Sequence, residues 1–364
     1  MKLLSSLLVF LLAPHQADAQ QCYEAYQKAA GAVTVYPYAT QLAVDYKANC
    51  SQYSLSVEAG GSSVGVKRVC GDPALGPVEI GLLSRDFKST EAAKQSDGYS
   101  FNCLIGDPTR QVARLAVAND AVIVFVKADP ITQPALALFE QKSSLSTAEC
   151  IKKLGCLSKD ILRWIYSNYT VSQLLSNGWH NVIPNSDNND TTHLWSELDS
   201  ACSSDEIKIS GTDYAAGDFD LFKSSILTGP FEGVRSEYVP FTNKSQVNEY
   251  VINNDGAIGF NDYNTAFSTI PNATVAVPIQ NSAWVCIDPS STTIADGTYN
   301  PFSRKTYMSV LKNNCTGLKA ALGYIQFAVS PIGQDIIKDN GGVKLNFDQQ
   351  NDTSTKIAAL STCN

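Results

Sequence analysis

The ten cysteines constrain the fold of this chain more than any other feature of its sequence. An even number of cysteines in an oxidising compartment favours disulfide bonds, here up to five, whose pairing the spacing does not reveal. A zinc site needs cysteines and histidines at short spacings, but the nearest two cysteines are Cys150 and Cys156. We therefore expect disulfide bonds and neither a metal site nor another cofactor. The cysteines are Cys22, Cys50, Cys70, Cys103, Cys150, Cys156, Cys202, Cys286, Cys315 and Cys363.

The N-terminus has the pattern of a secretory signal peptide. Lys2 precedes an apolar stretch over residues 3–13, and a small-x-small site, Ala-Asp-Ala, ends at Ala19. The stretch is shorter than the roughly 20 residues that span a bilayer, which counts against a membrane anchor. Residues 1–19 are therefore predicted to be a signal peptide cut before Gln20. We expect a secreted protein, outside the cell or at its surface.

Seven Asn-x-Ser/Thr sequons are acceptors for glycans if the cell is eukaryotic. They favour a eukaryotic secretory route and leave a bacterial periplasm as the alternative. The acceptor residues are Asn49, Asn168, Asn189, Asn243, Asn272, Asn314 and Asn351.

Composition and charge narrow the class of protein. The 364 residues are 44% hydrophobic and 17% charged, enough to bury a sizeable core in about two domains. The formal net charge of −8 counts against a partner that is a nucleic acid, because such binders neutralise phosphates with basic residues.

Hydrophobic periodicity predicts an α/β fold. Residues Ala39, Leu42, Ala43 and Tyr46 follow helical spacing after Pro37, which suits the first turn of a helix. Short alternating or apolar runs predict strands between such helices. The run over residues 121–126 is apolar throughout, as in a strand covered on both faces of a largely parallel sheet. Predicted strands cover residues 53–57, 78–83 and 121–126, and predicted helices cover residues 39–46, 66–70 and 318–329.

Three predicted turns place hydroxyl groups where a strand ends and a helix begins. They contain Thr34 and Val35, Ser62 and Ser63, and Ser84 and Arg85. The free N–H groups and partial positive charge of a helix N-terminus bind oxyanions. For any single turn, however, N-capping by Ser or Thr is the favoured interpretation.

Ser63 also lies at the centre of a G-x-S-x-G pattern over residues 61–65. This pattern suggests a serine hydrolase as an alternative function, with Ser63 as the nucleophile. Such an enzyme needs a histidine base, and only His180 and His193 follow the signal peptide.

Several segments resemble, in the same order, motifs of the periplasmic phosphate-binding proteins of ABC uptake systems. This resemblance implies two α/β lobes with mixed sheets, flanked by helices and joined by a hinge. On this basis residues 20–117 and 286–364 form the first lobe, and residues 118–285 form the second. The matching segments cover residues 31–37, 61–67, 78–85, 255–260, 299–304 and 330–337.

The resemblance also implies a set of ligand contacts. Thr34, the backbone N–H of Val35, Ser62 and Ser84 would bind the anion from the first lobe, with Arg85 or Arg304 nearby. From the second lobe, Gly217 and the following N–H groups would contribute. Here the sequence departs from the family, because Ala216 and Asp218 replace two hydroxyl residues.

Three interpretations of Asp218 stay open. Its side chain points away as an acid in the first turn of a helix, it accepts a hydrogen bond from a protonated phosphate, or the ligand is not phosphate.

The sequence as a whole favours a monomeric, non-enzymatic solute-binding protein. Its ligand would be inorganic phosphate or a similar oxyanion held between the lobes, and a membrane transporter is a further candidate partner. The alternatives are the hydrolase that uses Ser63 and a structural or adhesive protein that has lost its ligand.

Overall fold

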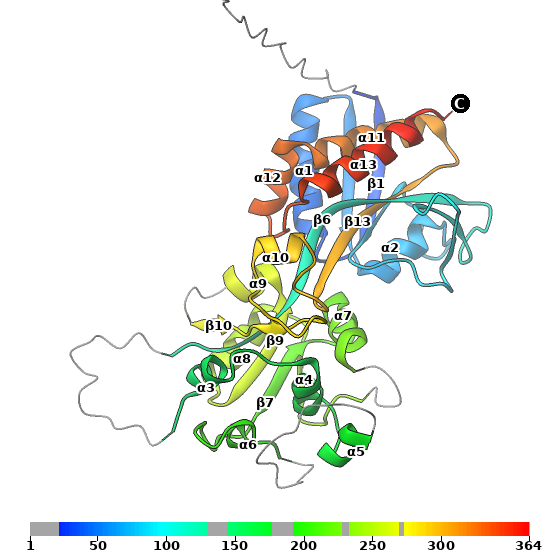
Figure 1. Cartoon of the computed structure of the whole chain (residues 1–364). Coiled ribbons are helices and arrows are strands. Elements are labelled where there is room, and N and C mark those ends of the chain that lie inside the picture. The colour runs from blue at the N-terminus through cyan, green and yellow to red at the C-terminus, as the bar shows by residue number, and fades with distance from the viewer. Residues whose placement is uncertain (1–21, 130–143, 177–191, 228–232, 269–272, 364) are drawn as a thin grey trace, which may run out of the picture.

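A computed structural model describes residues 22–129, 144–176, 192–227, 233–268 and 273–363. The predicted signal peptide, His180 and the sequons at Asn189 and Asn272 lie outside these residues. The described chain forms two lobes, each with helices packed on part of a mixed sheet (Figure 1). The predicted α/β class is therefore confirmed.

A single path of eight hydrogen-bonded strands runs through both lobes, in the order β2-β1-β3-β13-β6-β9-β7-β8. Neighbours β1, β2 and β3 are parallel in the first lobe, and β7, β8 and β9 are parallel in the second. The strands on this path are β1 (Ala25–Gly31), β2 (Tyr53–Ala59), β3 (Ile80–Leu83), β6 (Gln111–Lys127), β7 (Lys208–Thr212), β8 (Val239–Phe241), β9 (Ala257–Asp262) and β13 (Ser303–Leu311).

Strands β6 and β13 connect the lobes, because both run from one lobe into the other (Figure 1). Residues 121–126 of β6 are buried, as predicted. The comparison with a largely parallel sheet does not hold around this strand, because β6 pairs antiparallel with β9, β13 and β10 (Thr274–Ala276), within the mixed sheet that was expected. An apolar run reports that both faces of a strand are covered, and it carries no information about strand direction.

The first lobe packs four helices on one side of its strands and α2 on the other. The predicted helix after Pro37 is confirmed as α1, which buries Ala39, Leu42 and Tyr46. A short hairpin of β4 (Ala92–Lys94) and β5 (Ser100–Cys103) completes this lobe. Its helices are α1 (Tyr36–Asn49), α2 (Ser62–Val69), α11 (Cys315–Val329), α12 (Pro331–Asp339) and α13 (Phe347–Ser361).

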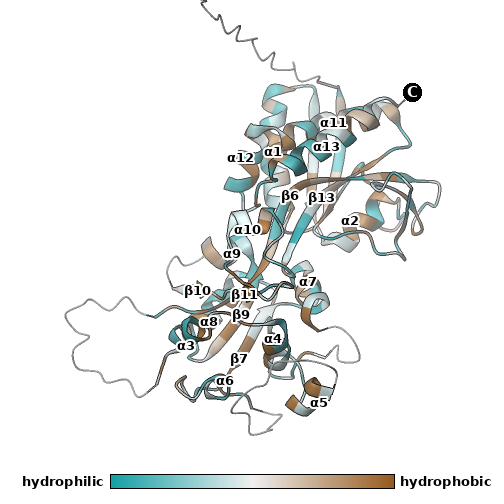
Figure 2. Cartoon of the chain, viewed as in Figure 1, coloured by the Kyte–Doolittle hydropathy of each residue, from teal (hydrophilic) through white to brown (hydrophobic). Residues whose placement is uncertain are grey.

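The second lobe has an aromatic core. Phe222 stacks on Phe260 with ring centroids 3.9 Å apart, and hydrophobic residues lie along β7 and β9 between the helices (Figure 2). A small hairpin of β11 (Ile279–Gln280) and β12 (Cys286–Ile287) lies beside them. The helices are α3 (Thr147–Leu154), α4 (Lys159–Tyr166), α5 (Val171–Ser176), α6 (Trp195–Leu198), α7 (Gly217–Ile226), α8 (Ser245–Asn253), α9 (Tyr263–Ser268) and α10 (Ser291–Ala295).

The hydrophobic cores indicate where one lobe ends and the other begins. Residues up to Ala118 and from Met308 onward belong mainly to first-lobe clusters. Tyr299 and Phe302 pack in the second-lobe cluster, although the sequence placed residues 286–364 in the first lobe. We therefore propose that the second boundary lies inside β13 rather than at residue 286.

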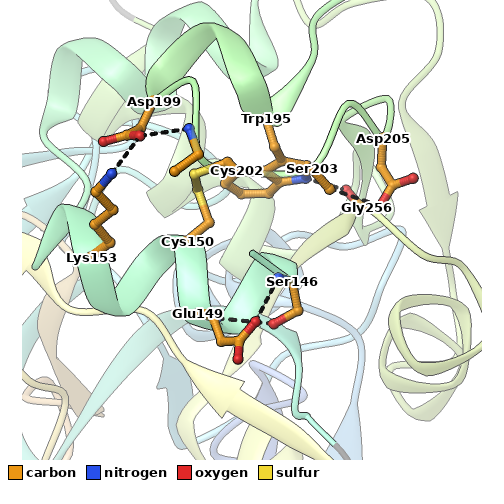
Figure 3. The surroundings of a disulfide bond; sticks show 11 residues. Ser146, Glu149, Cys150, Lys153, Trp195, Asp199, Cys202, Ser203, Asp205 and Gly256 are labelled. Atoms are coloured by element: carbon orange, nitrogen blue, oxygen red, sulfur yellow. Dashed lines mark hydrogen bonds and ion pairs between the residues drawn. A yellow bond between two sulfur atoms is a disulfide. The ribbon is translucent and has the colours of Figure 1, made fainter. Parts of the chain in front are cut away.

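All ten cysteines are paired, which confirms the expected five disulfides. Cys150–Cys202 joins α3 to the segment after α6, and the neighbouring ion pair of Lys153 and Asp199 joins the same two segments (Figure 3). None of the helices in the described ranges is long and apolar enough to cross a membrane. The pairs are Cys22–Cys50, Cys70–Cys103, Cys150–Cys202, Cys156–Cys286 and Cys315–Cys363.

Candidate functional site

A cavity of about 250 Å³ lies between the two lobes. It brings together five of the residues singled out from the sequence: Thr34, Ser62, Ser84, Gly217 and Asp218. The complete lining consists of Ala32, Val33, Thr34, Gly60, Gly61, Ser62 and Ser84 from the first lobe, and Asp213, Ala215, Ala216, Gly217, Asp218, Thr242 and Lys244 from the second.

Two hydroxyl groups of the first lobe lie together at the floor of this cavity. The Oγ atoms of Ser62 and Ser84 are 3.1 Å apart, and the Ser84 N–H donates to Ser62 Oγ over 3.0 Å. Both side chains are buried. Ser62 therefore uses its hydroxyl to join α2 to the end of β3, and it does not cap its own helix.

Two helices whose N-terminal residues line the cavity, α2 and α7, lack side-chain caps, and so does α1, which begins just beyond the cavity wall. The N-cap residues of α1, α2 and α7 are Val35, Gly61 and Ala216, and none of them makes a side-chain capping bond. The first N–H groups of a helix have no acceptor within it, so those of α2 and α7 are available to a ligand. Six other helices are capped by Ser146, Ser158, Ser290, Asn314, Ser330 and Asn346.

Two glycines allow the close approaches that shape the cavity. A Cβ on Gly65 would lie 2.7 Å from the carbonyl oxygen of Leu82, so only glycine lets α2 pack this close to β3. A Cβ on Gly217 would lie 2.8 Å from Ser84 Oγ. The first turn of α7 therefore contacts the opposite lobe directly across the cavity.

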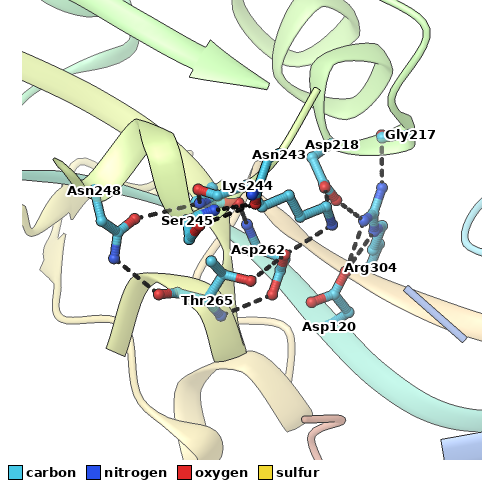
Figure 4. Close-up of polar contacts among 11 residues, drawn as sticks. Asp120, Gly217, Asp218, Asn243, Lys244, Ser245, Asn248, Asp262, Thr265 and Arg304 are labelled. Atoms are coloured by element: carbon cyan, nitrogen blue, oxygen red, sulfur yellow. Dashed lines mark hydrogen bonds and ion pairs between the residues drawn. The ribbon is translucent and has the colours of Figure 1, made fainter. Parts of the chain in front are cut away.

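A cluster of five charged residues backs the second-lobe side of the cavity (Figure 4). Arg304 of β13 pairs with Asp120 of β6 at 2.7 Å and also with Asp218. Lys244 lies 2.6 Å from Asp218 and 2.7 Å from Asp262. Both Asp218 oxygens are therefore engaged by cations, one from each side.

The cluster shifts the acidity of its members. Burial alone would raise the pKa of Asp218, but the Lys244 and Arg304 cations outweigh it and lower that pKa to about 2. Burial raises the pKa of Asp120 to about 6, although Arg304 acts in the opposite direction. For Lys244 burial acts downward, but the Asp218 and Asp262 carboxylates raise its pKa overall. Asp218 is thus ionised at neutral pH and serves as a hydrogen-bond acceptor only.

Two of the predicted contacts are not at the cavity wall. Arg85 donates to both carboxylate oxygens of Glu91, each over 2.8 Å, and to Ser63 Oγ over 2.9 Å. The N–H of Val35 is used in the turn before α1, where it donates to the carbonyl of Ala32 over 3.0 Å. Arg304 is close to the site through the Gly217 carbonyl, to which it donates over 2.7 Å.

Lys244 lines the cavity but is not among the ligand residues predicted from the sequence. Its ammonium group has three N–H donors, and Asp218 and Asp262 account for two of them. No short motif marks a lysine that precedes a helix as a ligand residue. Its role depends on Asp218 and Asp262, which are distant in sequence.

The arrangement needed by a serine hydrolase is not present among the described residues. Ser63 is exposed on α2 in the first lobe. His193 is buried in the second lobe, where its ring packs on Trp164 with centroids 4.0 Å apart. Burial and the Arg235 cation lower the pKa of His193 to about 3. Nor do the described ranges contain a group of three or more His, Cys, Asp or Glu that could hold a metal ion.

The sequence matches the PBP superfamily domain over residues 16–331. Because this match covers most of the chain, the chain belongs to the PBP superfamily, and the resemblance seen in its motifs is confirmed. A comparison with curated proteins finds no match.

Solved structures with this fold include proteins described as phosphate binders. One is a possible phosphate binding protein from Planctomyces limnophilus, with 19% identity, 93% of this chain and 99% of that chain covered, and a TM-score of 0.56. A second is an ABC-type phosphate transport receptor from Vibrio cholerae, with 16% identity, coverages of 87% and 99%, and a TM-score of 0.57. A third is a putative phosphate ABC transporter substrate-binding protein with bound phosphate, from Clostridium perfringens. It has 16% identity, coverages of 88% of this chain and 100% of that chain, and a TM-score of 0.56. At these identities the likeness shows a shared fold.

Proposed function

We propose that this protein is an extracytoplasmic, non-enzymatic solute-binding protein that holds inorganic phosphate, or a similar small oxyanion, in the cavity between its lobes. The observation that carries the proposal is the convergence of α2 and α7, both without side-chain caps, on a cavity to which the first lobe also contributes three hydroxyl side chains. Uncapped helix N-termini and hydroxyl groups donate hydrogen bonds to an anion without carrying a formal charge themselves.

The proposed contacts come from both lobes. Thr34, Ser62 and Ser84 donate hydroxyl hydrogens, and the first N–H groups of α2 and α7 donate from opposite sides. Lys244 supplies its third N–H and a positive charge. Closure of the lobes about β6 and β13 would then remove the ligand from water and strengthen each of these interactions.

The proposal treats Asp218 as an acid in the first turn of α7. Its two oxygens are occupied by Arg304 and Lys244, so its charge is compensated before an anion arrives. The backbone N–H groups at the start of α7 remain as donors, because Ala216 provides no side-chain cap. This supports the first of the three interpretations over a direct contact between two negative groups.

Isothermal titration of protein stripped of ligand tests the proposal. We expect saturable heat on addition of inorganic phosphate, and a rise in melting temperature with phosphate concentration. Sulfate at the same ionic strength is the matched control for general anion effects. Absence of heat and of thermal stabilisation with either anion would reject the proposal and favour the structural or adhesive alternative.

Membership of the PBP superfamily supports the further proposal that a membrane transporter receives the ligand. The five disulfides and the superfamily both support a place outside the cytoplasm. Co-purification with a membrane fraction in the presence and absence of phosphate would test this partner separately from the ligand.

A further inference from the structure

Five of the seven sequon asparagines lie in the described part of the chain, and all five are exposed: Asn49, Asn168, Asn243, Asn314 and Asn351. One of them differs from the others in its surroundings. Asn243 stands between Thr242 and Lys244, both of which line the cavity, and Figure 4 shows it on the same turn as Lys244. Asn49, by contrast, lies at the far end of α1 from the cavity.

The Asn243 side chain is held in one orientation. Its Oδ1 accepts hydrogen bonds from the N–H of Ser245 over 3.1 Å and from Ser245 Oγ over 2.9 Å. Within the described residues no hydrogen bond uses Nδ2, the atom that carries an N-linked sugar. Attachment of a sugar to Nδ2 would therefore break none of these hydrogen bonds, while Oδ1 keeps the side chain attached to the start of α8.

An exposed aromatic side chain lies on the adjacent strand end. The N–H of Asp213 bonds to the carbonyl of Phe241 over 3.0 Å, so the residues after β7 run beside those after β8. Tyr214 follows Asp213 and is 56% exposed. An aromatic ring that remains this exposed beside the cavity offers a flat apolar surface to a bound group.

We infer that Asn243 carries an N-linked glycan that covers Tyr214 and the second-lobe rim of the cavity. In the transfer, Nδ2 forms a bond to C1 of an oligosaccharide, the bond from C1 to the pyrophosphate of a lipid carrier breaks, and the Nδ2 proton leaves with that pyrophosphate. A further consequence rests on the proposed function: a small anion still reaches the cavity past the glycan.

The test uses the full chain secreted from a eukaryotic host. Glycopeptide mass spectrometry measures occupancy at Asn243 in the wild type and in two variants that abolish the sequon, Asn243→Gln and Ser245→Ala. The second variant keeps the bond from the Ser245 N–H to Asn243 Oδ1. Asn351→Gln removes a glycan site far from the cavity and serves as the matched control.

Hydroxyl-radical labelling of tyrosines then locates the glycan. We expect labelling of Tyr214 to rise several-fold in both sequon variants and after enzymatic deglycosylation of the wild type. Labelling of Tyr26, which is 68% exposed in the first lobe, should stay unchanged, as should Tyr214 in Asn351→Gln. An unoccupied Asn243, or equal Tyr214 labelling with and without the glycan, would overturn the inference.

Titration with inorganic phosphate separates this inference from the proposed function. We expect the wild type and Asn243→Gln to bind free phosphate equally, because the anion is small. If neither binds phosphate, the proposed function fails, but the occupancy and labelling results still decide whether a glycan covers this rim. Weaker phosphate binding by the wild type alone would contradict free passage of the anion past the glycan.

Discussion

The first lobe faces the cavity with the neutral hydroxyls of Thr34, Ser62 and Ser84, whereas the second lobe faces it with the carboxylate of Asp218 and the ammonium of Lys244. Both lobes add a helix N-terminus without a side-chain cap. The first-lobe groups need no counter-charge, but Asp218 is buried between Arg304 and Lys244, and Lys244 is paired with both Asp218 and Asp262. Loss of one second-lobe charge should therefore lower the free energy of unfolding, whereas loss of one first-lobe hydroxyl should mainly lower the affinity for the ligand.

The largest effect is expected for Asp218→Ala. This change removes two ion pairs of a buried carboxylate, while Arg304 keeps Asp120 and Lys244 keeps Asp262. The expected cost is therefore at the lower end of the range for breaking a buried pair, about 3 kcal/mol. Urea titration should show a fall of this size in the free energy of unfolding. Asp220→Ala is the matched control, since Asp220 lies in the same first turn of α7 but is exposed. Equal effects of the two variants would contradict the role given to the cluster.

The second effect is a pH dependence of the free energy of unfolding that arises from the ionisation of Asp120. Its pKa is raised from 3.8 to about 6, so the native state holds this proton more tightly than the unfolded chain does. The resulting stability is present below about pH 4 and is lost as the pH rises through 6, at about 1.4 kcal/mol for each pH unit between the two pKa values. Asp120→Asn should remove this loss, so the stability difference between variant and wild type should change by about 2 kcal/mol between pH 4 and pH 7. A constant difference over this range would show that Asp120 does not titrate there.

A smaller effect, on the ligand rather than on the fold, is expected for Ser84→Ala. A hydrogen bond to a charged group contributes about 1.5–3 kcal/mol, so affinity for phosphate should fall roughly 10–100-fold in a calorimetric titration. Ser63→Ala is the control, because Ser63 is exposed and does not line the cavity. It should bind phosphate as the wild type does. A loss of affinity in Ser63→Ala but not in Ser84→Ala would contradict the placement of these two hydroxyl groups relative to the ligand.

The smallest effect on affinity is expected for Arg85→Ala. The Arg85 guanidinium is fixed to Glu91 and Ser63 and lies outside the cavity lining. Phosphate affinity should therefore change little, although the free energy of unfolding should fall because Glu91 loses its partner. A large loss of affinity at full stability would return Arg85 to the ligand set first predicted from the sequence.

The first-lobe half of the site could be predicted because its signals are local. Thr34, Ser62 and Ser84 each lie in a turn that directly joins a strand to the start of a helix or to the next loop, and neighbouring strands bring these turns to one edge of the sheet. The α/β class and the helix after Pro37 are local in the same sense. The interpretation of Ser62 as a simple N-cap was excluded only by its bonds to Ser84, which lies 22 residues away.

The second-lobe half was predicted only in part: Gly217 and Asp218 line the cavity as expected, whereas Lys244 was not predicted, because its place depends on pairing between distant residues. In the sequence Asp218 is an isolated acid, and its partners Lys244 and Arg304 lie 26 and 86 residues further along the chain. The proposed shift of the lobe boundary has a related cause. Cys286 is bonded to Cys156, and Phe302 packs into the second-lobe core, and neither contact can be read from the local sequence.

The disulfides are distributed so that each joins segments within one lobe. Three lie in the first lobe and two in the second, with all ten cysteines in the described ranges. Oxidation therefore stiffens each lobe as a separate mechanical body and places no covalent tether across the gap between them. Under the proposed function, rotation of one body against the other would bend the two connecting strands, and ligand capture and release would cycle without breaking or exchanging a disulfide bond.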